Sequence, residues 1–318
     1  MIELYTNEGV FLKLAHVSDI PTDHSKLILI QFQDYNKEEL EWAKSNFDID
    51  LTIISNSEDI EISSHFMERE HQSSFHFSLP YYKQKDLMVE ESVFLVLTEN
   101  KIFTFTSAAQ DTYFSETYAH KLDLLKNKLH HANDLFAFLI AFFTDYYADV
   151  TENISKRVKQ LATRVLVKKE FKNEDLDTIT ELNFNNLLIK ESINEFSRIL
   201  TLKKKTARQA TTSLKDKIDE ELNDLSIISD HIQFNFDRLD DLKENISNKI
   251  ELEQNKIFKL LTVVTFCISM PTLIAGIYGM NFQNMPGVTS SYGYPAILTV
   301  MLLSVVVPLM YFKKKKWL

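Results

Sequence analysis

The distribution of apolar residues separates a β-rich N-terminal region from the rest of the chain. Four short runs rich in Phe, Val, Ile and Leu have the composition of buried strands: they are LILIQF (27–32), SFHFSL (74–79), SVFLVLT (92–98) and KIFTFT (101–106). Glu99 and Asn100 separate the last two runs, which predicts a hairpin turn, and KEELEWAKSNF (37–47) predicts a helix. Residues 1–107 are therefore expected to form an α/β domain, whose strand order the pattern leaves open.

The middle of the chain contains no helix-breaking residue. Between Pro80 and Pro271 there is neither glycine nor proline, which favours long helices. Residues 108–210 are expected to form a helical hairpin, with one helix over about 114–165 and a second over about 173–205.

A third helix is expected to run without interruption from Leu214 to about Tyr278. At 1.5 Å per residue its length is on the order of 100 Å, about three times the thickness of a bilayer. Part of it, residues 211–259, must therefore stand in water as a stalk. Pro271 is expected to introduce a kink or to free a backbone carbonyl.

The C-terminal part of the chain is apolar enough to cross a membrane. Residues 260–312 contain no Asp, Glu, Lys, Arg or His, and within them 260–278 and 295–312 are each about long enough for one span. Lysines precede the first span, and the basic tail 313–318 follows the second. Because basic flanks stay in the cytoplasm, both termini should lie there and the loop 279–294 outside. Two buried core helices are the alternative, but they would not require these lysines.

Composition and charge narrow the function classes. The chain is 45% hydrophobic with a net charge of −10, and without the four lysines Lys313–Lys316 residues 1–312 carry −14. Such acidity argues against nucleic acid as a partner and suits a protein that handles cations. The single cysteine, Cys267, excludes a disulfide or a multi-thiol metal site within one chain. The N-terminus lacks the pattern of a signal peptide, so the expected location is the inner membrane of a bacterium, with the hydrophilic part in the cytoplasm.

The first apolar span carries a stripe of small and polar residues on one helical face. Its members alternate at spacings of three and four: they are Asn255, Phe258, Thr262, Thr265, Ser269, Thr272, Gly276 and Gly279. Small residues allow close helix packing, and Ser and Thr also bond to their own helix. The competing interpretation is a water-lined pore formed by several copies of the face.

The same stripe continues into the stalk as a line of polar residues. They are Asp237, Asp241, Glu244, Asn248 and Glu251. A charged line on a helix is usually a solvated face. The alternative is an acidic pore entrance that holds divalent cations.

The sequence that joins the first span to the loop is specific. The run 271–282, PTLIAGIYGMNF, resembles the signature of the CorA magnesium-channel family. The run 254–262, the Gly293-Tyr294-Pro295 start of the second span and the lysine-rich end are also similar to that family. The strong match covers residues 254–318, and the preceding part agrees in plan only.

The resemblance implies a funnel-shaped homopentamer with a cytoplasmic α/β domain, a continuous stalk and pore helix, and an outer ring of second spans. The loops Gly279-Met280-Asn281 would surround the outer mouth, with Asn281 meeting hydrated Mg²⁺, the transported ion rather than a cofactor. Co²⁺ and Ni²⁺ are further candidate ions. The implied pore-lining residues are Asn255, Phe258, Leu261, Thr262, Thr265, Ser269, Thr272 and Gly276, with Phe258 and Leu261 as a hydrophobic gate.

Two departures from the family concern the loop and the pore. The loop after Asn281 is uncharged, with Gln283 and Gly287 where relatives often carry acids, and Ser269 is more polar than in some relatives. Ion selection should then depend on hydrogen-bond geometry more than on charge. Regulatory cation sensing in the family implies stalk acids, and the candidates here are Asp219, Glu220, Asp224 and Asp230, with His231 as a weaker one.

Three other functions compete with magnesium transport. The zinc-transporting branch of the superfamily tends to change the middle residue of the tripeptide, so Met280 favours magnesium. A membrane-anchored scaffold would explain the stalk and spans but not the stripe joined to the loop motif. For an enzyme we find no glycine-rich phosphate loop, no zinc-ligand spacing and no nucleophile–base pair, so an enzyme is not expected.

Overall fold

The structure, a computed structural model, describes residues 1–55, 65–83, 86–106, 121, 129–206, 212–280, 285–287, 290–315 and 317. It divides into two compact units, Met1–Leu242 and Lys243–Leu318. The boundary falls within one long helix, and each unit is described by itself.

The first unit contains a seven-stranded sheet in the order β2-β1-β3-β7-β6-β5-β4. Its strands are β1 (Ile2–Thr6), β2 (Phe11–Leu14), β3 (Leu27–Gln33), β4 (Phe66–Glu68), β5 (Gln72–Tyr82), β6 (Met88–Thr98) and β7 (Ile102–Thr106). The four apolar runs are confirmed as β3, β5, β6 and β7, and the expected hairpin pairs Leu97 with Ile102. β3 and β7 pair in parallel, whereas the other neighbours are antiparallel.

Helix α1 (Lys37–Phe47) has the bounds that the sequence predicted. A capping box starts it: Glu39 N donates to Asn36 Oδ1 at 3.0 Å, and Asn36 N donates to Glu39 Oε2 at 2.9 Å. The helix covers one face of the sheet, where Phe32 and Phe105 stack with ring centroids 5.0 Å apart. A short 3₁₀ turn, η1 (Val17–Asp19), precedes β3.

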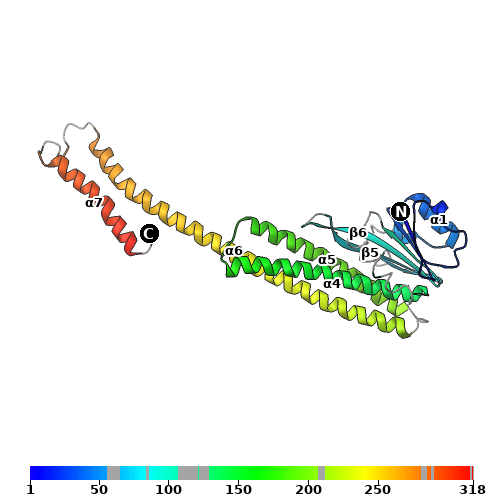
Figure 1. Ribbon diagram of the computed structural model, residues 1–318. Coiled ribbons are helices and arrows are strands. Elements are labelled where there is room, and N and C mark those ends of the chain that lie inside the picture. Colours follow the sequence, from blue (N-terminus) through cyan, green and yellow to red (C-terminus); the bar gives the residue numbers. More distant parts are fainter. Residues whose placement is uncertain are drawn as a thin grey trace. The chain divides into compact units, whose positions relative to one another are not determined.

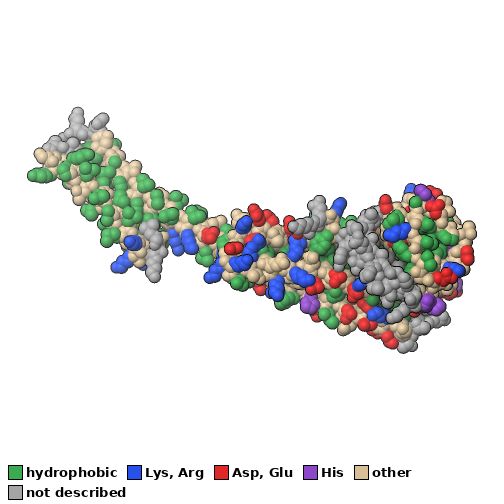
Figure 2. Space-filling model, viewed as in Figure 1, with side chains coloured by type: hydrophobic (Ala, Val, Ile, Leu, Met, Phe, Trp, Pro, Cys, Tyr) green, Lys and Arg blue, Asp and Glu red, His purple; other side chains and the backbone are tan. Residues whose placement is uncertain are grey.

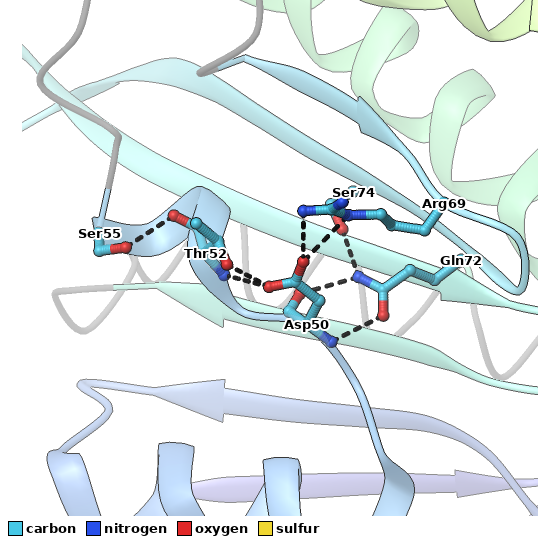
Figure 3. Close-up of polar contacts among 6 residues, drawn as sticks. All are labelled: Asp50, Thr52, Ser55, Arg69, Gln72 and Ser74. Carbon is cyan, nitrogen blue, oxygen red and sulfur yellow. Dashed lines mark hydrogen bonds and ion pairs between the residues drawn. The ribbon is translucent and has the colours of Figure 1, made fainter.

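A polar network joins the short helix α2 (Thr52–Ser55) to the β4–β5 hairpin (Figure 3). The Asp50 carboxylate accepts bonds from Thr52 N at 2.8 Å and Arg69 Nε at 3.1 Å, and the Gln72 side chain pairs with both Asp50 N and Asp50 O at 2.8 Å. Bonds from Thr52 and the Arg69 guanidinium hold the pKa of Asp50 below its usual range despite partial burial. The network thus fixes a loop of the sheet domain and leaves its acid charged.

The other face of the sheet is covered by two long helices, on which the first part of a third one packs (Figure 1). They are α4 (Ala132–Ala162), which continues as the π-helical turn η3 (Thr163–Val167), α5 (Glu174–Thr206) and the first part of α6 (Thr212–Tyr278). Tyr146 on α4 donates to Pro80 O at 2.8 Å, and the hydroxyls of Tyr147 and Ser192 lie 2.6 Å apart.

The first part of α6 packs through a regular seam. Its buried positions recur at spacings of four and three: they are Leu214, Ile218, Glu221, Leu225, Ile228, Ile232, Asn235, Leu239 and Leu242. One of its polar members, Asn235, donates to Ser155 Oγ at 2.9 Å, and Asn186 on α5 donates to Ile232 O at 2.9 Å. These bonds set the register of α6 against the other two helices.

The expected helix bounds are confirmed for α5 and α6 but are wrong for α4. The helix predicted over 114–165 is not continuous: Lys121 is helical, but residues 129–131 are not, His131 is extended, and α4 starts at Ala132. Residues 107–120 and 122–128 lie outside the described part. The prediction failed because the sequence has no glycine or proline before Ala132 to mark the boundary.

A buried histidine lies on β5 within a stack of rings. His76 is 4% exposed, and its ring is stacked between His65 at 5.1 Å and Phe94 at 4.6 Å. Among the described residues neither ring nitrogen of His76 has a hydrogen-bond partner. Burial, and secondarily the neighbouring His65, lowers the pKa of His76 to about 4.

We expect the stability of the sheet domain to fall between pH 6.5 and about 4. In this window the unfolded chain takes up a proton on His76 while the folded chain does not, so the free energy of unfolding decreases by up to about 3 kcal/mol as pH falls. Urea unfolding followed by Trp42 fluorescence in a Trp317→Phe background measures this. His76→Phe should abolish most of the dependence, and an unchanged dependence would show that other groups cause it.

The second unit contains the C-terminal part of α6 and helix α7 (Gly293–Lys314). Both helices are long and apolar enough to cross a membrane, and hydrophobic side chains cover this part of the chain in Figure 2. α6 stays helical through Pro271, and because proline has no N–H the carbonyl of Cys267 loses its helical donor.

Candidate functional site

The candidate pore-lining residues lie on one exposed face of α6. At about 100° per residue they fall within roughly 120° of one another around the helix axis. All of them are exposed in the single chain: Asn255, Phe258, Leu261, Thr262, Thr265, Ser269, Thr272 and Gly276. The exposure of Phe258 (63%) and Leu261 (59%) is high for apolar side chains. Such a face is available for lipid or for further copies of the chain.

The opposite face of α6 contacts α7. Val263 and Cys267 are buried, Pro271 and Ile274 are half-buried, and Phe266 meets Phe312 of α7 with ring centroids 6.1 Å apart. These buried positions lie about half a turn around the helix from the candidate face. Contact between α6 and α7 within one chain therefore leaves the stripe of hydroxyls and glycines uncovered.

Three hydroxyls of the stripe donate to carbonyls of their own helix. Thr262 Oγ1 bonds to Phe258 O at 2.8 Å, and Thr272 Oγ1 bonds to Ile268 O at 2.7 Å. Ser269 Oγ bonds to Phe266 O at 3.1 Å. Because each hydroxyl has used its proton, its oxygen presents lone pairs to the exposed side. A row of acceptors of this kind suits the water molecules around a hydrated cation.

A groove runs along this face towards the loop. It is lined by Thr265, Ser269, Thr272, Gly276 and Met280, with Val264, Ile268, Leu273 and Ile277 at its sides. An added Cβ on Gly276 would meet nothing within 4 Å in the single chain. The glycine is therefore not needed for packing within the chain.

The Gly-Met-Asn loop begins where α6 ends. Gly279 N donates to Ala275 O at 2.8 Å, and a Cβ on Gly279 would lie 3.0 Å from the same oxygen. A side chain there would force the last turn of the helix to shift. Met280 is 50% exposed, whereas Asn281 lies outside the described residues.

The backbones of Gly287 and Gly293 approach each other closely in the segment between the two spans. The sequence did not reveal this contact. A Cβ on Gly293 would lie 1.8 Å from Gly287 O, and Gly287 has a φ of +85°. Gly293 N donates to Ser290 O at 2.9 Å. Both positions thus require glycine, one for a close approach and one for its backbone conformation. The Gly293-Tyr294-Pro295 motif was the only sequence signal of this closure.

The stalk acids of the candidate sensor are exposed and spread along α6. Asp219 pairs with Lys204 of α5, and Glu220 pairs with Lys217 at 2.8 Å. Asp224, Asp230 and His231 are also exposed. Among the described residues, one chain brings no group of three or more His, Cys, Asp or Glu together to hold a metal ion.

The stripe positions in the stalk are exposed as well. This holds for Asp237, Asp241, Glu244, Asn248 and Glu251. These positions are therefore not part of the seam through which α6 packs on its neighbours. The stripe in the stalk is accessible to solvent or to another copy of the chain.

The chain matches the family described as CorA-like Mg²⁺ transporter protein over residues 24–314. The magnesium transport protein CorA of Wolinella succinogenes is 30% identical over 325 residues, with all of both chains covered. The CorA proteins of Campylobacter jejuni (strain RM1221) and Haemophilus influenzae (strain Rd) are 30% and 27% identical, covering 88% and 96% of this chain and 88% and 97% of their own.

Solved structures show the same fold at low sequence identity. The complete CorA magnesium transporter of Methanocaldococcus jannaschii superposes with a TM-score of 0.77 at 18% identity, covering 100% of this chain and 98% of its own. The full-length CmaX protein gives a TM-score of 0.68 at 13% identity, with 99% and 97% covered. The ZntB cytoplasmic domain of Vibrio parahaemolyticus gives 0.59 at 8% identity, with 79% and 98% covered.

The superposition on the complete Methanocaldococcus jannaschii structure covers the α/β sheet domain, the long helix α6 and the second apolar helix of this chain. The resemblance read from the tripeptide is confirmed, and the two apolar helices are the two membrane spans of such a protein. With its two membrane-spanning helices, the chain belongs to the CorA-like Mg²⁺ transporter family.

Proposed function

We propose that copies of this chain assemble as a homopentamer around an axial channel that carries Mg²⁺ across the membrane, with Co²⁺ and Ni²⁺ as further ions. The observation that carries the proposal is the exposed stripe on α6, which faces away from α7 and ends at Gly279 and Met280. Family membership and the names of the relatives support the choice of magnesium.

The proposal assigns a place to each segment. Residues 1–107 and 108–210 form the cytoplasmic sheet domain and helical hairpin, and 211–259 the stalk. The pore-lining span is 260–278, and 295–312 forms the outer span, joined by the extracytoplasmic loop 279–294. The basic tail 313–318 lies on the cytoplasmic side of a bacterial inner membrane.

The hydrogen-bond acceptors on the stripe suit the passage of an ion that keeps its water molecules. Mg²⁺ loses its water reluctantly, so a pore that accepts hydrogen bonds from that water avoids the cost of stripping it. Side-chain carbonyls of a ring of Asn281 would serve at the outer mouth, and the oxygens of Ser269 and Thr272 would serve further in. The membrane potential contributes roughly 4.6 kcal/mol per 100 mV for two charges.

Phe258 and Leu261 would form the gate. Their side chains are exposed on the stripe face in the single chain, about one turn and one residue before Thr262, the first hydroxyl of the stripe. In the pentamer, the Phe258 and Leu261 side chains of all subunits would converge on the axis, exclude water from this part of the pore and stop the ion. In the same assembly Asp219, Glu220, Asp224 and Asp230 would bind regulatory cations with acids of a neighbouring copy.

Ion flux into liposomes that contain the purified protein tests this function. We expect Mg²⁺ to enter, Co²⁺ and Ni²⁺ to enter or compete, and Zn²⁺ and Na⁺ to enter more slowly. Preferred Zn²⁺ flux would support the zinc branch of the superfamily. Absence of divalent flux at all internal Mg²⁺ concentrations would favour a membrane-anchored scaffold, and a native mass other than that of five subunits would contradict the pore geometry.

A further inference from the structure

The end of the α4–α5 hairpin forms a basic pocket. The pocket has a volume of about 640 Å³, within the range of small-molecule sites. Five cationic side chains line it, and no Asp or Glu does; the five are Lys156, Arg157, Lys159, Arg164 and Lys168. This concentration of positive charge contrasts with residues 1–312 as a whole, which carry a net charge of −14.

The backbone around the pocket is tightly connected. The Asp175 side chain is 3% exposed, pairs with Arg164 and accepts a bond from Lys172 N at 2.8 Å. Lys169 adopts a left-handed φ of 58°, which turns the chain from η3 back towards α5. Arg164 and the connecting loop are therefore held in place before any ligand arrives, which lowers the entropy cost of binding.

The positive charges of the pocket are only partly neutralised. Arg157 pairs with Asp86 at 2.8 Å, Lys156 with Glu152 at 2.9 Å and Arg164 with Asp175. Within the part of the chain that the structure describes, Lys159 and Lys168 have no carboxylate within 4.0 Å. Like charges that share one concave site repel one another, and an anion would relieve the repulsion.

We propose that this pocket binds an anion that carries several phosphate groups. The guanidinium groups of Arg157 and Arg164 match phosphate oxygens in geometry, and the lysines supply point charges. Cations spread over more than two turns of α4 and the following loop suit a chain of phosphates better than a single one. The ligand class is a soluble polyphosphate, and a phospholipid headgroup shares the chemistry. The proposal does not depend on the ion pathway.

Calorimetric titration with inorganic triphosphate, in the absence of divalent cations, tests the pocket in the full-length protein. The protein is held in nanodiscs of phosphatidylcholine. We expect saturable binding of one anion per chain that weakens as salt is raised. The double variant K159E/K168E should raise the dissociation constant at least tenfold. The matched control K37E/K205E changes the same charge at two other exposed lysines and should bind like the wild type.

Nanodiscs that also contain phosphatidylglycerol separate the two sources of phosphate. If a headgroup occupies the pocket, triphosphate binding to the wild type should disappear in these discs and return when they are replaced by neutral ones. Binding in both kinds of disc identifies the soluble anion. The proposal is overturned if triphosphate fails to bind in neutral discs, or if K159E/K168E binds it as tightly as K37E/K205E.

Discussion

Replacing Asn281 by alanine is expected to lower Mg²⁺ flux by about ten- to a hundredfold. The proposed ring would lose a side-chain carbonyl from every subunit at once, so a loss of only about 0.5 kcal/mol per hydrogen bond is multiplied by the number of subunits. The uncharged loop offers no acid to compensate. Flux assays in liposomes with equal protein content measure the effect.

Asn284→Ala is the matched control, because it removes the same side chain three positions further along the same loop. We expect it to change flux less than twofold and to leave the native mass unaltered. If Asn281→Ala transports as fast as the wild type, or no more slowly than Asn284→Ala, then Asn281 does not meet the ion.

Replacing Gly276 by leucine is expected to reduce Mg²⁺ flux more than tenfold without preventing folding. In the single chain nothing lies within 4 Å of the position of an added Cβ, so the side chain meets no steric obstacle there. In a ring of subunits the same side chains would converge on the axis and narrow the water-lined path. Gly276→Ala should reduce flux by a smaller factor.

Ala296→Leu provides the control for this substitution, because Ala296 is an exposed small residue on the outer helix α7. It should retain wild-type flux, and all three variants should show the same native mass. Normal flux through an assembled Gly276→Leu channel would remove Gly276 and its neighbours from the pore and return the stripe to a role in helix packing.

The membrane part of the protein could be predicted well because its signals are local. A run without charges, a flanking lysine and a three–four spacing are all properties of adjacent residues, and one helix preserves them as a face. The long helix α6 was predictable for the same reason, since no glycine or proline interrupts it before Pro271. The start of α4 at Ala132 was missed where no local breaker marks it.

The sheet was predictable only in part. The strands rich in Phe and Val were found, but β1, β2 and β4 were not. The parallel pairing of β3 with β7 joins segments that are far apart in the chain, as Leu29 pairs with Ile102. Such pairing depends on which faces become buried together, and no short stretch of sequence encodes it.

The sequence by itself determined that this chain has two spans, a stalk and a loop with the Gly-Met-Asn signature, because chemistry and periodicity along one helix suffice for these. The tertiary structure decided which face of α6 is free. The sequence marked one face of the first span as small and polar, but only the burial of Val263 and Cys267 shows that α7 covers the opposite face and leaves this one uncovered in the single chain. It also brought Gly287 against Gly293 and gathered the basic pocket. These features are contacts between segments that are separate in the sequence. Their energies depend on distances in space, which the positions of the residues along the chain do not specify.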